Sequence, residues 1–99
     1  MHIISRKTLK EFCERPARRD AKGPLDAWWH EVKRANWETP ADIKARYRSA
    51  SILKNNRVVF NIGGDKYRVV VKINYPTKTV FIRFVGTHRE YDKIDAEVI

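Results

Sequence analysis

The sequence predicts an α+β fold in which N-terminal helices pack on a small antiparallel β-sheet. Up to about residue 50, apolar residues recur at the three- and four-residue spacing of amphipathic helices. From residue 51 onward, short runs rich in Val, Ile, Phe and Tyr are separated by Gly, Pro and Asn, a pattern typical of strands and turns. The chain has 99 residues, so we expect one domain over residues 1–99.

The first predicted helix covers residues 6–14. Ser5 is a favourable N-cap, and Pro16 ends or interrupts the helix. Residues 1–4 are compatible with a short strand before it. The helix has one apolar face, formed by Leu9, Phe12 and Cys13.

The second predicted helix begins at Gly23-Pro24, after a basic segment at residues 15–22 that lacks an apolar stripe. We expect this basic segment to form a loop or a solvated helical turn. Helical periodicity places Trp28 and Trp29 on the apolar face of the second helix, so we expect both to pack in the core rather than stack on bases. The same face also holds Leu25, Val32 and Asn36.

The third predicted helix begins at Thr39. This residue is the N-cap, Pro40 occupies the first helical position, and Asp42 completes a capping box at the third. Ile43 and Tyr47 form the buried side of this short helix.

The second half of the chain predicts a meander of strands at residues 52–54, 57–62, 66–75 and 79–85. Gly63-Gly64-Asp65 and Pro76-Thr77-Lys78 mark the turns of the two hairpins. In the last strand, alternation predicts Val80, Ile82 and Phe84 on one face. Arg83 is then expected on the opposite face with Phe81 and Val85, where the neighbouring strand adds Arg68, Val70 and Lys72. A final helical turn is expected over residues 90–94.

The chain is strongly basic. It holds 21 Lys and Arg against 12 Asp and Glu, a formal net charge of +9. Such a charge on a small domain favours a polyanionic partner such as RNA, DNA or an acidic protein. No apolar run is long enough for a transmembrane helix, and the N-terminus lacks the pattern of a signal peptide. The single cysteine, Cys13, cannot form an internal disulfide, which fits a cytoplasmic protein.

Titratable side chains gather where the last strand is expected to end. Gly86 is expected to break the strand, and Thr87, His88, Arg89, Glu90, Tyr91 and Asp92 follow. The sequence predicts no metal site, because His2, His30 and His88 are widely separated and no metal-ligand spacing occurs. There is also no phosphate-binding glycine loop, and no cofactor is predicted.

These residues suit metal-independent RNA cleavage, in which the substrate supplies its own nucleophile, the 2′-hydroxyl. The enzyme must transfer protons and stabilise charge on the phosphate. An imidazole such as His88 exchanges a proton near neutral pH, guanidinium groups such as Arg68 and Arg83 fork onto phosphate oxygens, and Tyr91 can stack on a base. Further phosphate contacts are predicted for Lys54, Arg57, Lys72, Arg89 and Lys93, and Asp92 is a candidate orienting residue. The alternative is that His88 is only solvated and the arginines form ion pairs.

Five segments resemble the HigB family of bacterial toxins, which are similar to the wider RelE group of mRNA interferases. The segments cover residues 24–37, 39–44, 57–64, 66–75 and 81–92 and keep their order along the chain. The last contains the motif Thr87-His88-x-Glu90-Tyr91-Asp92. The wider RelE group often places Arg or Lys at the position of His88, which makes a histidine acid or base more plausible here.

The resemblance implies a RelE-like fold and metal-independent cleavage of mRNA, usually at the A site of the small ribosomal subunit. It implies a type II toxin–antitoxin module, with a HigA-like helix-turn-helix antitoxin that neutralises the toxin. Operator DNA would then be bound only indirectly, through that antitoxin, and no membrane is involved. His88, Tyr91, Arg68 and Arg83 are the implied catalytic residues. The alternative function is a non-catalytic basic module that binds nucleic acid or an acidic protein, for example as a co-repressor with the antitoxin.

Overall fold

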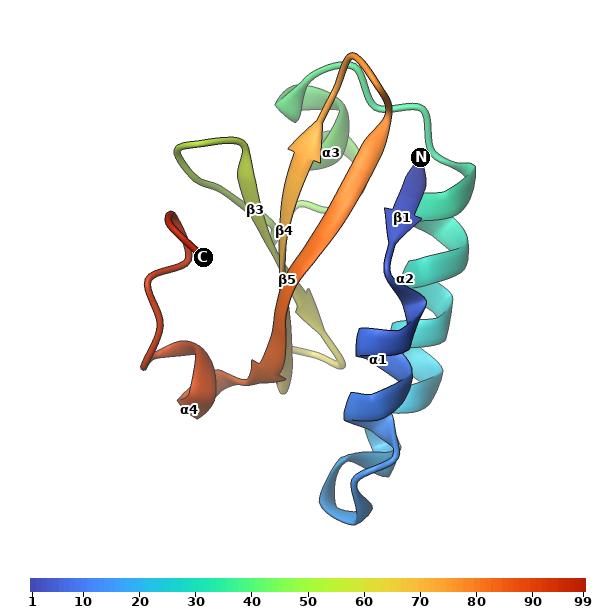
Figure 1. Cartoon of the computed structure of the whole chain (residues 1–99), viewed down its shortest axis with the longest axis vertical. Coiled ribbons are helices and arrows are strands. Elements are labelled where there is room, and N and C mark those ends of the chain that lie inside the picture. The colour runs from blue at the N-terminus through green and yellow to red at the C-terminus, as the bar shows by residue number, and fades with distance from the viewer.

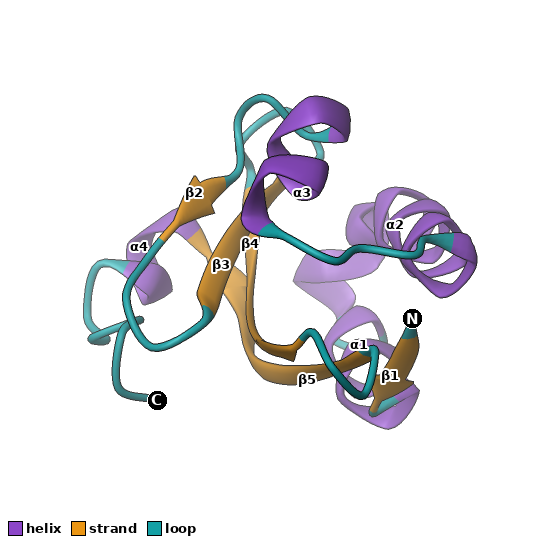
Figure 2. Ribbon diagram, turned by 90° about the horizontal axis from the view of Figure 1, so that it is seen from above, coloured by secondary structure: helices purple, strands orange, loops and turns teal.

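Three helices cover one face of a five-stranded sheet, and a fourth short helix lies beyond the other face (Figures 1 and 2). The computed structural model describes residues 1–99. The predicted α+β fold is confirmed, and its layers are those of a RelE-like domain. The elements in chain order are β1 (His2–Ile4), α1 (Arg6–Cys13), the 3₁₀ helix η1 (Pro16–Ala21), α2 (Lys22–Arg34), α3 (Pro40–Arg46), β2 (Ser51–Ile52), β3 (Arg57–Ile62), β4 (Tyr67–Asn74), β5 (Thr79–Thr87) and α4 (His88–Tyr91).

The sheet is mixed rather than wholly antiparallel. Its strand order is β1-β5-β4-β3-β2, and β2 to β5 form the predicted antiparallel meander. The edge strand β1 pairs in parallel with β5, with His2 opposite Thr79. The helices α1, α2 and α3 lie between β1 and the meander in the sequence, and a parallel pair needs such a long crossover. The short apolar run at residues 1–4 therefore acts as an edge strand.

The helices match their predicted positions closely. α1 ends one residue earlier than expected, and the capping box of Thr39 and Asp42 at the start of α3 is present. The basic segment forms the helical turn η1, the second of the two expected alternatives. The last helical turn, α4, begins at His88, two residues before the predicted start. None of the helices has the length and apolar character needed to cross a membrane.

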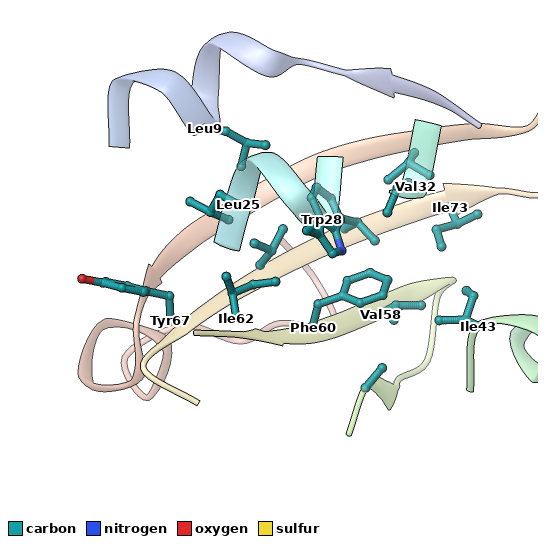
Figure 3. Close-up of a cluster of buried hydrophobic side chains, with 14 of the residues drawn as sticks. Leu9, Leu25, Trp28, Val32, Ile43, Val58, Phe60, Ile62, Tyr67 and Ile73 are labelled. Carbon is teal, nitrogen blue, oxygen red and sulfur yellow. The ribbon is translucent and has the colours of Figure 1, made fainter. Parts of the chain in front are cut away.

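The core lies between the helices and the sheet and is centred on Phe60 of β3 (Figure 3). The Phe60 ring is 1% exposed and contacts three other aromatic rings. It packs edge-on against Trp28 at 5.3 Å and Tyr47 at 5.1 Å, and it stacks on Trp37 at 6.0 Å between centroids. Helical periodicity correctly placed Trp28 in the core. Trp29 is only half-buried, beside the guanidinium group of Arg6.

A β-bulge in β5 changes the faces predicted for its side chains. Val69 pairs with Val85, and Val70 pairs with Phe84, but Val71 pairs with Ile82, so Arg83 has no partner in the ladder. An extra residue shifts every later side chain to the other face of the sheet. The prediction for the last strand was therefore wrong beyond Ile82. Val85 packs on the helix side, and Phe84 joins the opposite cluster with Val70.

A second, smaller apolar cluster covers the sheet face opposite the helices. Val59 and Val70 of the sheet are buried there against Ala96, which follows α4. Phe84, Tyr91 and Ile94 pack around these residues. The chain after α4 thus returns over the sheet face that was predicted to carry Arg68, Val70 and Lys72, and part of that face is closed.

Three carboxylates with lowered pKa values predict a loss of stability in acid. The pKa of Asp20 is lowered by its hydrogen bond from Lys66, that of Asp42 by the backbone N–H of Glu38, and that of Glu90 by the backbone N–H of Thr87. A carboxyl whose pKa is depressed by folding stabilises the protein above its unfolded pKa of about 4 and loses that contribution as the pH falls through the folded value.

We therefore expect the melting temperature to fall steeply below about pH 4. Scanning calorimetry between pH 2 and pH 7 measures this. Asp42→Asn should flatten the profile, whereas the same change at exposed Asp65 should not. Equal effects of the two substitutions would contradict the assignment of acid sensitivity to the carboxylate of Asp42, which caps α3.

Candidate active site

The titratable cluster lies at the junction of β5 and α4. The expectation that Gly86 breaks the strand was wrong, because β5 continues through Gly86 to Thr87 and Gly86 pairs with Arg68. Gly86 is needed for space instead. A Cβ at this position would lie 2.5 Å from Cζ of Phe84, far inside van der Waals contact. The glycine therefore lets the Phe84 ring cover the end of the strand.

A capping box starts α4. The backbone N–H of Thr87 donates to Glu90 Oε1 at 2.9 Å, and the backbone N–H of Glu90 donates to Thr87 Oγ1 at 3.2 Å. This reciprocal pair satisfies two amides that the helix leaves free. The helix begins immediately after the strand, so His88 and Tyr91 are attached directly to the end of β5.

His88 is exposed to solvent and lies next to a carboxylate. Its Nδ1 is 3.4 Å from Oδ2 of Asp92, one helical turn later. A carboxylate beside Nδ1 favours a proton on that nitrogen and leaves Nε2 free to accept or donate a proton. The predicted orienting role of Asp92 is compatible with this geometry.

Arg68 and Tyr91 form a stacked pair. The guanidinium carbon of Arg68 lies 4.6 Å from the centre of the Tyr91 ring, and Tyr91 also contacts Phe84. Arg68 comes from β4, whose pairing with β5 brings it opposite Gly86. Its Nε is buried and has no hydrogen-bond partner in the protein. A guanidinium group held against a ring is suited to bind an anion such as a phosphate oxygen.

The other predicted residues do not all join this cluster. Arg83 is exposed at the bulge of β5, and Arg89 is exposed on α4 itself. Lys93 is exposed immediately after α4. Lys54 and Lys72 are exposed on the neighbouring strands and turn, and Lys72 lines a hollow of about 460 Å³ with Asn55, Asn56, Arg57, Glu97 and Val98.

Arg57 is in a different position from the one expected of an RNA contact. Its side chain is buried, and its Nε donates to the main-chain oxygen of Ile99 at 3.1 Å. Its Nη1 donates to the main-chain oxygen of Asn55 at 2.9 Å. These donors hold the returning chain against the sheet, so the structure leaves Arg57 out of the cluster.

One contact of the site could not be seen in the sequence. Arg18 of η1 forms an ion pair with Glu90 of α4, with 2.7 Å between Nη2 and Oε1. The sequence placed Arg18 in a basic solvated segment and gave Glu90 no role. No local pattern links residues 72 positions apart, so only the folded chain reveals this pair.

Comparisons with known proteins identify the family to which the chain is similar. The family model of the HigB toxin, a RelE-like toxic component of a toxin–antitoxin system, matches residues 21–94. The chain is 31% identical over 96 residues to the mRNA interferase HigB of Escherichia coli O6:H1, covering 95% of this chain and 91% of that protein. It is 33% identical over 94 residues to the mRNA interferase toxin HigB of Escherichia coli K12, covering 93% and 88%.

These matches establish both the broad class of the protein and its family within that class. A match of this length places the chain among the RelE-like toxic components of toxin–antitoxin systems. Within that class, the chain belongs to the HigB toxin family. The resemblance found in the sequence is thereby confirmed.

Proposed function

We propose that this protein is an endoribonuclease, an mRNA interferase, and the toxin of a type II toxin–antitoxin module. The observation that carries the proposal is the convergence of Arg68, His88 and Tyr91 at the end of β5, within the segment matched by the HigB family model. The relatives named mRNA interferase HigB cover nearly the whole chain, so they support the same activity.

The chemistry assigns one role to each group. The 2′-hydroxyl of the substrate loses its proton as its oxygen attacks the adjacent phosphorus, the bond from phosphorus to the 5′-oxygen breaks, and the 5′-oxygen takes up a proton. His88 carries out one of these two proton transfers through Nε2, either from the 2′-hydroxyl or to the 5′-oxygen, and Asp92 orients its ring. Arg68 and Arg83 bind the phosphate oxygens as charge builds up, and Tyr91 orients the substrate or stacks on a base. The products are a 2′,3′-cyclic phosphate, or the 3′-phosphate that its hydrolysis gives, and a 5′-hydroxyl.

Membership of a toxin–antitoxin family supports an antitoxin partner and an mRNA substrate, and the proposal extends to the following partners. The toxin acts on mRNA in the bacterial cytoplasm, at the A site of the translating ribosome. A HigA-like helix-turn-helix antitoxin neutralises it, and the complex reaches operator DNA through the antitoxin. Exposed Lys54, Lys72, Arg89 and Lys93 supply phosphate contacts around the cluster, and no cofactor takes part.

Controlled expression in a bacterial host tests the activity. Growth arrest with new 5′-hydroxyl ends inside coding regions is the expected result, and purified protein that has been treated with EDTA and then dialysed should still cleave mRNA on ribosomes. Normal growth with intact mRNA from a folded wild-type chain would contradict the proposal. It would point instead to a basic module that binds without cutting.

Arg68→Ala should lower the cleavage rate by about 10²-fold, because loss of one preorganised donor at a developing charge costs about this much. Arg68→Lys keeps the charge but loses the fork and the stacking on Tyr91, so it should restore little of the rate. Single-turnover cleavage measures both. Arg34→Ala removes the same charge from the exposed end of α2 and should leave the rate unchanged. Equal losses for Arg34→Ala and Arg68→Ala would mean that only net charge matters.

A further inference from the structure

α4 is one helical turn of four residues, and it carries both His88 and Tyr91. A single turn has little stability of its own, because nucleating a helix is unfavourable and tertiary contacts must hold it. The capping box of Thr87 and Glu90 ties this turn to the end of β5, which is its own neighbour in the chain. Tyr91 holds one side of this turn through its contacts with Arg68 and Phe84, and the position of His88 also depends on what holds Glu90.

Arg18 is the side chain that reaches Glu90 from elsewhere in the fold. The Oε1 atom that accepts the Thr87 backbone N–H at 2.9 Å also lies 2.7 Å from Nη2 of Arg18. The Arg18 side chain is only 17% exposed and that of Glu90 38%, so solvent screens this pair less than it screens a surface pair. One carboxylate oxygen thus joins η1, the end of β5 and α4.

Arg18 is held by a direct contact with α1 and by the anchoring of its own helix, η1, to the sheet. Its guanidinium carbon lies 4.7 Å from the centre of the Phe12 ring on α1. Two residues later, Asp20 accepts hydrogen bonds from Lys66 Nζ and from the Tyr67 hydroxyl at the start of β4. η1 is therefore anchored to the sheet, and Arg18 extends from a fixed support.

We infer that Arg18 is a positioning residue of the active site, which acts through Glu90 to hold α4, and with it His88 and Tyr91, against the end of β5. The inference rests on the proposed function and extends it by one residue. Arg18 does not contact the substrate in this scheme. Its role differs from that of Arg19, the next residue in the same basic segment, whose side chain is exposed to solvent.

Arg18→Gln and Arg19→Gln form a matched pair, because each removes one positive charge from η1. We expect Arg18→Gln to lower kcat by roughly 10- to 100-fold, since small displacements of catalytic groups have effects of this size, with KM changed less than about twofold. Arg19→Gln should leave kcat unchanged. Arg18→Lys, which can still pair with Glu90, should recover part of the loss. Glu90→Gln should make Arg18→Gln nearly silent, because both act on one contact.

Amide hydrogen exchange of the purified full-length chain supplies a second readout that needs no substrate. Arg18→Gln should speed exchange at Thr87, Glu90 and Asp92, whose N–H groups bond within this turn. The core amides of β4 should stay protected as in the wild type. This separates a local release of α4 from a general loss of stability.

Each outcome decides the inference. Unchanged kcat and unchanged exchange in Arg18→Gln would overturn it. A raised KM with a reduced salt dependence, as for a lost phosphate contact, would also overturn it and make Arg18 an RNA ligand. If the wild type cleaves no RNA, the proposed function fails on its own, and faster exchange in Arg18→Gln alone would still establish that Arg18 holds α4. If Arg18→Gln does not fold, Arg18→Lys and Glu90→Gln carry the same comparison.

Discussion

His88→Gln is expected to lower the rate of RNA cleavage by about 10²- to 10⁴-fold, the usual contribution of a general acid or base. Glutamine keeps a polar side chain of similar length, but it cannot exchange a proton near neutral pH. His88 is exposed and packs in neither apolar cluster, so its loss should leave the fold intact. Single-turnover cleavage of a defined mRNA on ribosomes, with circular dichroism as a check on folding, measures the effect.

His30→Gln is the matched control. His30 is also exposed and also lies on a helix, but α2 covers the opposite face of the sheet from α4 (Figure 2). The His30→Gln variant should therefore cleave RNA at the wild-type rate. An unchanged rate in His88→Gln would remove the histidine from the proton transfer. The remaining candidates at this edge would then be Tyr91 and the exposed Arg89.

Local patterns accounted for most of the secondary structure. The capping box of Thr39 and Asp42 determined where α3 begins, because the signal lies within four consecutive residues. The predicted strand over residues 57–62 matches β3 at both ends, since alternation and flanking turns mark a strand of this kind. In both cases the interactions that decide the structure are made by neighbours in the sequence.

The predictions that failed concern features that are determined by residues far apart in the sequence. The bulge at Arg83 arises from the register between β4 and β5, and no residue in the strand itself marks an extra position. The parallel pairing of β1 depends on how the helices pack, and the burial of Arg57 depends on the chain returning to Ile99. Strand periodicity carries none of this information.

The candidate site also combines features that follow from neighbouring residues with features that depend on distant ones. His88 and Tyr91 lie three residues apart and were singled out together as a local cluster of titratable groups. Arg68 was chosen from its place on a sheet face, and the stacking on Tyr91 that gives it a defined position appears only in the fold. The link from Arg18 to Glu90 spans most of the chain. Sequence reasoning therefore finds reactive groups more readily than the residues that hold them.

Phe60→Ala is expected to lower the free energy of unfolding by about 3–5 kcal/mol, the usual cost of removing a large buried aromatic side chain. The ring is 1% exposed and contacts Trp28, Trp37 and Tyr47, which belong to α2, the following loop and the end of α3. An alanine would leave a cavity between β3 and these aromatic rings. Since small domains are stable by only about 5–15 kcal/mol in total, much of the native stability should be lost.

Urea unfolding followed by circular dichroism measures this loss as a lower midpoint with an unchanged slope. Phe81→Ala is the matched control, because it makes the same change on β5 at a ring that is only half-buried. It should cost clearly less, since the transferred area and the cavity are both smaller. Equal losses for the two variants would mean that the aromatic cluster around Phe60 adds nothing beyond ordinary burial. A larger loss at Phe81 would place the main core on the other face of the sheet.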